Sequence, residues 1–243
     1  MRYLLHVHTS CSQDSILDKY LLLLMCCLYH IDCVAITDHN ELRHALAWQG
    51  FFARHGVRII PGEEVFTAEG EIIGLFLSQR IPAGLTPEQT VSEIRRQGGV
   101  VYVPHPFDQK RHRSVLRPEA LQRIQQDVDC IEIHNGRNVE AWYDARQQAV
   151  CERVGALPVV GEDAHCFFEV GRNIIEMPSS QDTASFLQAL RSPEVVFQRR
   201  PCIGLAHRVT KFVRLGKMIA KGDVHGIQRI LYRRLGSGKP QAG

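Results

Sequence analysis

Several histidine and acidic side chains occur in short motifs, each of which follows an apolar run. His6 and His8 alternate at the end of one run, and Asp163 and His165 repeat the same spacing near another. Because side chains two residues apart on a strand point the same way, each pair can bind one ion. Further motifs of this kind are Asp38-His39, Gly62-Glu63-Glu64, Pro104-His105-Pro106 and His134-Asn135. Zinc, manganese and iron accept such a mixed nitrogen and oxygen set, so the pattern predicts a divalent metal site.

Each motif alone also has a simpler interpretation. The His6/His8 pair can be an exposed or hydrogen-bonded pair, and Asp38 can be a helix N-cap. Glu63 and Glu64 can form a solvated turn, and His105 can lie in an exposed proline loop. The joint pattern favours a metal site over these interpretations. The remaining histidines do not follow an apolar run, and we expect ordinary structural roles for them: His30, His44, His55, His112, His207 and His225.

The order of elements predicts how these motifs meet. Seven β-rich runs cover residues 3–7, 33–37, 57–60, 72–77, 100–103, 130–133 and 157–160. Helix-compatible stretches cover residues 17–29, 41–55, 87–97, 118–126 and 139–154. Strands that alternate with helices predict βαβ units and a parallel sheet, either a (β/α) barrel or a doubly wound sheet. In both folds the loops after the strands form one rim, so the motifs would converge there.

Composition and charge divide the chain into an acidic body and a basic extension. Of 243 residues, 44% are apolar, which is typical of a globular protein and excludes disorder. Residues 199–243 contain 11 Lys/Arg and one acid, a net of +10, so residues 1–198 carry 18 bases and 25 acids, a net of −7. We therefore expect one folded domain over residues 1–198 and a basic, partly helical extension over residues 199–243.

The extension predicts a basic amphipathic helix. Arg208, Lys211, Arg214, Lys217 and Lys221 are spaced by three or four residues, which puts them on one helix face. Such a helix can contact nucleic acid, an anionic membrane surface or the acidic body of the chain itself. The sequence alone leaves these partners open.

Apolar stretches and cysteines indicate the compartment. The longest apolar stretch, residues 21–28, is far shorter than the roughly 20 residues that span a bilayer. The apolar run before His6 is too short for a signal peptide. The chain's eight cysteines include no C-x-x-C pair, which favours reduced thiols over disulfides or a structural zinc site. We expect a cytoplasmic protein without a transmembrane segment.

Six motifs in order resemble one known family over residues 1–170. They are L-H-V-H-T, A-I-T-D-H-N, P-G-E-E, P-H-P-F, I-E-I-H-N and G-E-D-A-H, and their set resembles the PHP (polymerase and histidinol phosphatase) family. The resemblance implies an α/β fold, a distorted (β/α)7 TIM-like barrel with a trinuclear metal centre at the C-terminal rim of the strands. The chain departs from the pattern at Leu4, where many members have Asp, and at Glu71-Ile72-Ile73, where some subfamilies have an extra histidine.

The resemblance also implies nine ligands for two or three divalent ions (Zn, Mn or Fe). One ion would be held by four of them, His6, His8, Glu64 and Asp163. A second would be held by Asp14, His39 and His165, and a third by His105 and His134, with Glu64 bridging two ions. The division of ligands among the ions is less defined than the set itself.

Such a centre is suited to hydrolysis of phosphate esters by a metal-activated water. The substrate would be a phosphomonoester or a nucleotide or oligonucleotide phosphodiester. Candidate general acids are His39, His165 and Asp38, among which the sequence does not choose. A non-catalytic, metal-stabilised barrel that serves as a binding or structural module is the alternative.

Three basic residues are candidates for substrate binding. Arg137 follows His134 by three residues and can clamp a phosphate, although a surface salt bridge explains it equally well. Lys110 and Arg111 lie in a basic run after Pro106 and can attract an anionic substrate, or they can simply be solvated.

Overall fold

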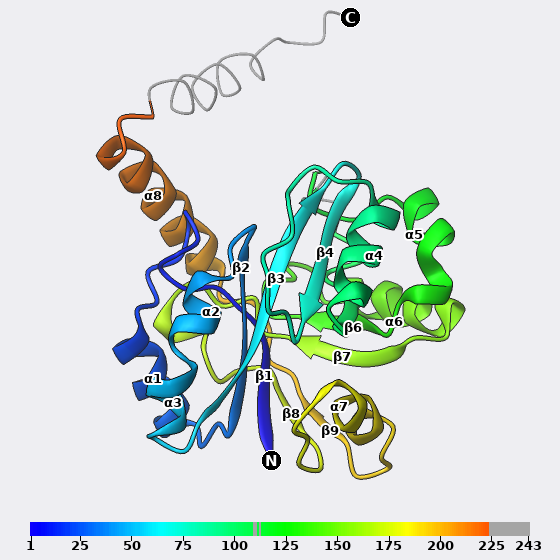
Figure 1. Ribbon diagram of the computed structural model, residues 1–243. Coiled ribbons are helices and arrows are strands. Elements are labelled where there is room, and N and C mark those ends of the chain that lie inside the picture. Colours follow the sequence, from blue (N-terminus) through cyan, green and yellow to red (C-terminus); the bar gives the residue numbers. More distant parts are fainter. Residues whose placement is uncertain (109–110, 112, 224–243) are drawn as a thin grey trace, which may run out of the picture.

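Nine strands form one curved sheet that nearly closes into a barrel (Figure 1). A computed structural model describes residues 1–108, 111 and 113–223. The order of strands in the sheet is β7-β6-β5-β4-β3-β2-β1-β8-β9. Their bounds are β1 Arg2–Val7, β2 Cys33–His39, β3 Arg58–Thr67, β4 Gly70–Leu75, β5 Val100–Val103, β6 Cys130–Asn135, β7 Leu157–Gly161, β8 Ile174–Glu176 and β9 Val196–Gln198. The predicted barrel fold is confirmed.

The barrel closes between β1 and β7. Val7 forms a parallel bridge with Ala164, just beyond the end of β7. The Glu162 amide donates to the Leu5 carbonyl at 2.8 Å, and the His8 amide donates to the Ala164 carbonyl at 2.9 Å. These bonds bring the motifs that follow β1 and β7 side by side at one end of the barrel.

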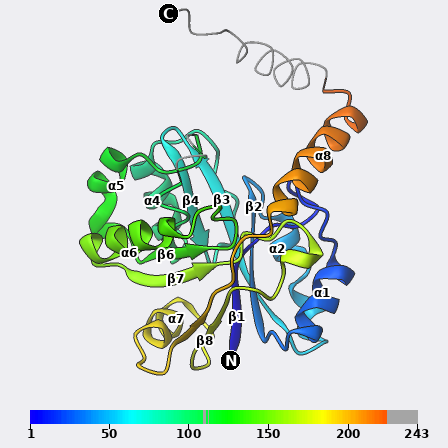
Figure 2. The same cartoon turned by 180° about the vertical axis from the view of Figure 1, so that it is seen from behind.

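Within the described residues, eight α-helices surround the sheet. Their bounds are α1 Lys19–Leu28, α2 Arg43–Ala47, α3 Gln49–Ala53, α4 Pro87–Arg96, α5 Pro118–Ile124, α6 Trp142–Val154, α7 Thr183–Leu190 and α8 Gly204–Ala220. In both views α1–α3 lie on one side of the barrel and α4–α6 on the other (Figure 2). None of the helices in the described residues has the length and apolar character that crossing a membrane requires.

Local signals explain where the helices begin. Asp18 accepts hydrogen bonds from the amides of Tyr20 and Leu21 and so caps α1. Thr86 and Gln89 form a reciprocal capping box at α4, with Pro87 in the first turn. Thr86 is therefore the N-cap of α4. The eight cysteines are free thiols, as expected.

Two predictions about the elements were wrong. The sheet is not wholly parallel, because β4 runs antiparallel to both β3 and β5. A tight turn at Ala68-Glu69 joins β3 directly to β4, so no helix separates them. The expected helix over 41–55 is two short helices, α2 and α3, and the elements α7, β8 and β9 were not predicted.

The C-terminal extension begins where β9 ends. Its first part forms α8, which stands at the end of the barrel where the carboxyl end of β2 lies (Figure 1). Residues from 224 onward lie outside the described residues, so the rest of the predicted basic extension is not described. The two-part division of the chain stays a prediction.

Candidate metal centre

Eight of the nine predicted ligands lie together at the rim of the barrel. His6 is the penultimate residue of β1, His8 comes just after that strand, and His39 ends β2. Glu64 lies on β3, which extends beyond the predicted strand, and His105 follows β5. Asp163 and His165 follow β7, and Asp14 comes from the loop between β1 and α1.

Unusual backbone conformations aim three of these side chains. The φ angles of His6, His105 and Asp163 are 64°, 29° and 51°, in the left-handed region that residues with a Cβ rarely adopt. Such strain persists where surrounding contacts impose it, and it concentrates at functional sites. Here the closure of β1 on β7 holds the backbone next to His6 and Asp163 in place.

The first predicted group, His6, His8, Glu64 and Asp163, is assembled. His6 Nε2 lies 3.3 Å from Glu64 Oε1 and 3.6 Å from Asp163 Oδ1. His8 Nε2 lies 3.3 Å from Glu64 Oε2 and 3.5 Å from Asp163 Oδ1. Donor atoms about 2.1 Å from a tetrahedral ion are about 3.4 Å from one another. The spacing of these four side chains therefore fits one divalent ion.

A second group lies beside it. Asp14 Oδ1 is 3.4 Å from His165 Nε2, and Asp14 Oδ2 is 3.9 Å from His39 Nε2. His8 stacks between the two histidines, with ring centroids 4.4 Å from His39 and 4.2 Å from His165. Donor atoms of His8, His39 and His165 are close enough to share an ion.

The third predicted group is only half assembled. His105 Nε2 lies 3.1 Å from Glu64 Oε1, as the resemblance implies. His134, in contrast, makes its contacts elsewhere: its Nδ1 is 2.6 Å from Asp144 Oδ2 and its Nε2 is 3.1 Å from Asn173 Oδ1. The structure does not bring His134 to the other eight predicted ligands.

Two buried glutamates were missed by sequence reasoning. Glu71, near the start of β4, lies 3.4 Å from both His39 Nδ1 and His105 Nε2. Glu132, on β6, accepts from His6 Nδ1 at 2.7 Å and from the His105 amide at 2.6 Å, and it also binds the Tyr102 hydroxyl. A carboxylate in this position fixes the orientation of a ligand histidine. Glu132 stands two residues before His134 in the I-E-I-H-N motif, which was the available signal for it.

Burial and charge perturb the titration of the cluster. Burial lowers the pKa of His39, but the carboxylates of Glu64, Glu71 and Asp14 outweigh it and raise that pKa to about 10. For Asp163, burial raises the pKa, and the nearby Arg111 and His6 outweigh that effect and hold it well below its usual range. The cluster is thus a buried, strongly anionic site, which is the electrostatic setting that binds cations.

The donor set fits divalent ions on a further observation. Glu71 Oε1 and Asp14 Oδ1 are buried and have no hydrogen-bond partner among the described residues. Buried polar atoms are normally satisfied, so an unsatisfied carboxylate oxygen beside several histidines is the kind of donor that a metal ion completes. Buried His, Glu and Asp clusters here indicate divalent metal binding, with the number and identity of the ions left open.

Asp38 lies behind the cluster rather than in front of it. It is fully buried, and its Oδ1 accepts hydrogen bonds from the Thr9 amide and the Ser12 hydroxyl, both at 2.7 Å. The Ser12 hydroxyl in turn accepts from the His39 amide and contacts His8 Nδ1. Asp38 is absent from the pocket lining, so it positions the loop after β1 instead of facing a substrate.

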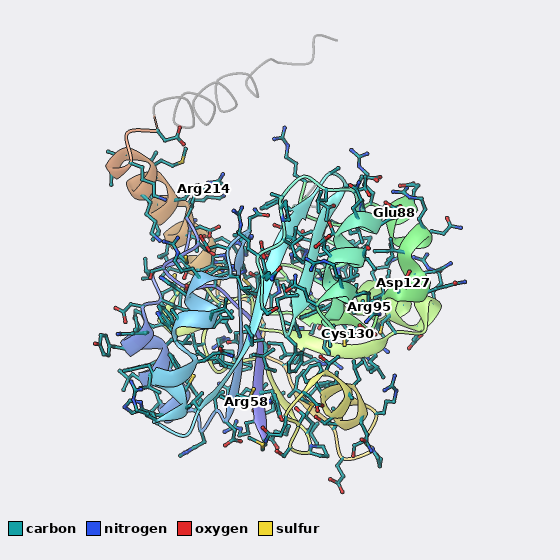
Figure 3. The ribbon with its side chains drawn as sticks, in the orientation of Figure 1. Arg58, Glu88, Arg95, Asp127, Cys130 and Arg214 are labelled. Atoms are coloured by element: carbon teal, nitrogen blue, oxygen red, sulfur yellow. The ribbon has the colours of Figure 1, made fainter. Side chains whose placement is uncertain are left out.

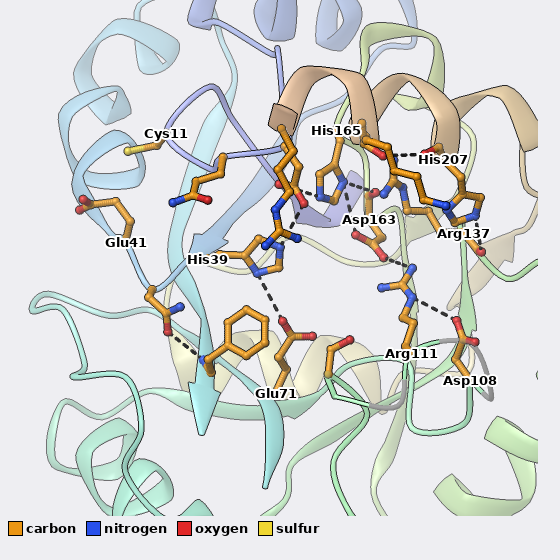
Figure 4. A pocket seen from close by; sticks show the side chains of 18 of the residues that line it. Cys11, His39, Glu41, Glu71, Asp108, Arg111, Arg137, Asp163, His165 and His207 are labelled. Carbon is orange, nitrogen blue, oxygen red and sulfur yellow. Dashed lines mark hydrogen bonds and ion pairs between the residues drawn. The ribbon is translucent and has the colours of Figure 1, made fainter. Parts of the chain in front are cut away.

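The three predicted substrate-binding residues differ in their placement. Arg111 lines the pocket, where its Nη2 lies 2.7 Å from Asp163 Oδ2 and its Nε lies 3.0 Å from Asp108 Oδ2 (Figure 4). Arg137 also lines it, but its guanidinium is paired with Glu169 at 2.9 Å, and both residues are buried. Lys110 lies outside the described residues.

A pocket of about 900 Å³ opens over the cluster, and α8 forms one wall of it. His207, Thr210, Lys211 and Arg214 of α8 line the pocket together with His39 and other residues of the barrel. Arg214 lies on the side of α8 that faces the barrel (Figure 3). Seven of the lining residues are cationic: Arg43, Arg80, Arg111, Arg137, Lys211, Arg214 and Lys221.

Lys217 fastens α8 to the loop that carries Asp14. Its ammonium donates to the carbonyl oxygens of Ser10, Ser12 and Ser15 at 2.9, 2.8 and 2.7 Å. Three donors of one ammonium are thus satisfied by one loop. The expected helix is therefore a docked part of the pocket.

Comparison with known proteins finds curated relatives of the chain. No family model matches the chain. The uncharacterised protein MJ0417 of Methanocaldococcus jannaschii is 34% identical over 200 residues, which cover 79% of each chain. MJ1587 of the same organism is 35% identical over 141 residues, covering 54% of this chain and 80% of the relative. At this identity and coverage the chain and MJ0417 belong to one family.

Solved structures share the fold at lower identity. PsfC from Pseudomonas syringae has a TM-score of 0.59 at 18% identity, covering 90% of this chain and 98% of its own. A Bifidobacterium adolescentis protein proposed to be a metal-dependent phosphoesterase has a TM-score of 0.58 at 15% identity, covering 77% and 95%. A Chromobacterium violaceum amidohydrolase, solved with bound sulfate and no metal, has a TM-score of 0.56 at 16% identity, covering 80% and 97%.

Proposed function

We propose that this chain is a metal-dependent phosphoesterase of the PHP family that hydrolyses a phosphate ester with water. The observation that carries the proposal is the group of His6, His8, Glu64 and Asp163, whose donor atoms lie 3.3–3.6 Å apart beneath a cation-lined pocket. Divalent ions bound there would polarise a phosphoryl oxygen and lower the pKa of a water molecule toward neutrality.

The chain's own residues supply binding and orientation. Arg111 places a guanidinium beside the ligand Asp163, with 20% of its side chain exposed to the pocket. A guanidinium in that place can donate two hydrogen bonds to phosphate oxygens and neutralise charge that develops on them. Arg137 is occupied by Glu169, so we propose Arg111 rather than Arg137 as the phosphate-binding arginine.

The wall formed by α8 favours a substrate with more than one anionic group. Lys211 and Arg214 line the pocket and form no ion pair with another described residue. Phe66, at the same pocket, is 38% exposed, and its ring lies 5.5 Å from that of His39. An exposed aromatic ring beside unpaired cations suits a nucleobase and its phosphates. We therefore propose a nucleotide or an oligonucleotide end as the substrate, ahead of a small phosphomonoester.

The proton for the leaving group has two candidate donors. His39 and His165 both line the pocket, and 24% of the His39 side chain is exposed against 3% for His165. Asp38 lies behind the metal ligands and is no longer a candidate donor. A pH–rate profile of each histidine variant separates the two, because loss of the acid removes the alkaline limb of the profile.

The test is hydrolysis of a generic phosphomonoester and a generic phosphodiester by the purified full chain. Reactions contain Mn²⁺ or Zn²⁺, with and without a chelator, and compare wild type with a His6→Ala/Asp163→Ala double variant. His55→Ala is the matched control, because His55 is exposed and remote from the pocket lining. We expect turnover that the chelator and the double variant abolish and that the control keeps.

Failure would lead to different conclusions. Turnover that survives both the chelator and the double variant would refute the metal-dependent mechanism. No turnover of either ester, with metal still bound, would favour the alternative of a non-catalytic metal-binding module.

The proposed nucleic-acid contact is tested through α8. Lys211→Ala/Arg214→Ala should raise the KM for an oligonucleotide and flatten its salt dependence, because fewer counterions are released on binding. Arg208→Ala, on the same helix but outside the pocket lining, is the control. An unchanged salt slope in the double variant would remove α8 from substrate binding.

A further inference from the structure

The reversed strand β4 brings an additional carboxylate into the metal centre. In the β3–β4 pair, Phe66 lies opposite Glu71 and Glu64 lies opposite Ile73. Residues opposite each other share a face of the sheet, and so do residues two apart on one strand. Glu64 and Glu71 are therefore diagonal neighbours on the inner face of the barrel.

Glu71 makes nearly the same contacts as the predicted ligand Glu64. Both carboxylates approach His39 Nδ1, Glu64 at 3.0 Å and Glu71 at 3.4 Å. Both also approach His105 Nε2, Glu64 at 3.1 Å and Glu71 at 3.4 Å. Donor atoms of His39, Glu64 and Glu71 are close enough to hold one ion. Glu71 is 1% exposed, and its Oε1 has no hydrogen-bond partner in the described part of the chain.

His134, the ligand that the family pattern implies for this position, is fully engaged elsewhere. Its Nδ1 is 2.6 Å from Asp144 on α6, which also accepts from the Asn138 amide group at 2.9 Å. Its Nε2 faces Asn173 Oδ1 at 3.1 Å and the Arg200 carbonyl at 3.3 Å. Both ring nitrogens thus have oxygen partners outside the cluster.

The carboxylates crowded around Glu71 favour the binding of a cation there. The cluster gathers four carboxylates, Asp14, Glu64, Glu71 and Asp163, and the guanidinium of Arg111 contacts Asp163. Carboxylates brought together away from water repel one another strongly unless cations lie between them. Glu64 and Glu71 face the rings of His39 and His105 instead, and donor atoms of His39, Glu64 and Glu71 are close enough to share an ion.

We propose that Glu71, and not His134, completes the ion site that Glu64 and His105 begin, with His39 at its edge. This deepens the proposed function, on which it rests only in requiring that the cluster binds metal. Carboxylate oxygens suit manganese and magnesium better than zinc, so the exchange of a histidine for Glu71 makes this position a site for a hard divalent cation such as Mn²⁺.

The test is Mn²⁺ binding to the full chain, with Mn²⁺ alone as the probe and no substrate present. Wild type, Glu71→Gln and His134→Gln are compared by calorimetric titration and by metal content after gel filtration. We expect Glu71→Gln to lose one bound ion or to bind it at least about 10-fold more weakly. His134→Gln is expected to keep the wild-type number of ions and affinity.

Folding and metal binding are separated by thermal unfolding in chelator. Without bound ions Glu71→Gln should be at least as stable as wild type, because the amide keeps the size of the side chain and removes an ionisable group that burial and Glu64 disfavour in its charged form. If Glu71→Gln does not fold, Glu71→Asp keeps the carboxylate at shorter reach, and it is expected to bind the same number of ions with weaker affinity.

The opposite pattern overturns the proposal. Loss of an ion in His134→Gln, alone or together with Glu71→Gln, would restore His134 as the ligand, and unchanged binding in Glu71→Gln would exclude Glu71. The His6→Ala/Asp163→Ala variant distinguishes this failure from that of the proposed function. If that variant also binds every ion, the cluster is not a metal centre at all.

Discussion

Replacement of Arg137 by Met tests whether this arginine supports the fold or binds a phosphate. The Arg137 Nε donates to Glu169 Oε1 at 2.9 Å, and its Nη2 lies 3.4 Å from Glu169 Oε2, with both residues 6% exposed. Breaking a buried ion pair by removing one partner costs about 3–5 kcal/mol, because the other charge stays buried. Glu169 Oε2 keeps its hydrogen bonds from the His165 and Cys166 amides, so we expect the lower limit, about 3 kcal/mol.

The assay is urea unfolding followed by circular dichroism at pH 7. Arg208→Met is the control, since replacing an exposed cation should change stability by less than about 0.5 kcal/mol. A double variant, Arg137→Met/Glu169→Gln, should recover part of the loss, because no unpaired charge remains and the amide oxygen can still accept from the His165 and Cys166 amides. Wild-type stability of Arg137→Met, combined with a raised KM for a phosphate ester, would show that Arg137 binds substrate and that its pairing with Glu169 contributes little.

Three further predictions concern residues around the site. A Cβ on Gly161 would lie 1.9 Å from Glu132 Oε1, so Gly161→Ala should displace this carboxylate from His6. We expect the variant to bind Mn²⁺ about 10–100-fold more weakly in a titration. Equal affinity of the variant and the wild type would contradict an orienting role for Glu132. Burial raises the pKa of Glu63 to about 7. The stability that the protonated carboxyl group contributes is therefore present below about pH 4.5 and is lost as the pH rises through 7. The loss in free energy of unfolding is at most about 3 kcal/mol. Glu63→Gln should be less pH-dependent than wild type in urea unfolding at pH 5 and 8, and parallel behaviour of the two would refute this. Lys217→Met should release α8 and speed its cleavage by a protease, whereas unchanged cleavage would show that other contacts dock the helix.

The strands and most ligands were predictable because their signals are local. His6 and His8 follow an apolar run with strand spacing, and the loops after parallel strands share one rim, so their meeting with Asp163 follows from the fold class. Glu71 was missed because β4 runs antiparallel to β3. The start of β4, and not its end, therefore reaches the rim. The short turn between β3 and β4 was the feature of the sequence that indicated this reversal.

The orientation of His134 was not predictable in the same way. Its position on β6 follows from the apolar pattern, but the direction of its ring depends on Asp144 and Asn173, which arrive from a helix and a loop farther along the chain. The place of α8 was likewise hidden. Its amphipathic spacing predicted a helix with several possible partners, and the contacts of Lys217 with the first loop show where that helix lies.

The fastening of α8 has a consequence for the order in which the protein matures during synthesis. Lys217 is joined to the chain 202 to 207 residues after the carbonyls that it binds. The ligands and strands of the barrel have all been translated before this lysine leaves the ribosome. A nascent chain can therefore assemble its metal centre while the wall of the pocket is still missing, so the ions have an open route to the cluster. Docking of α8 then adds the last wall of the pocket to a cluster that is already assembled.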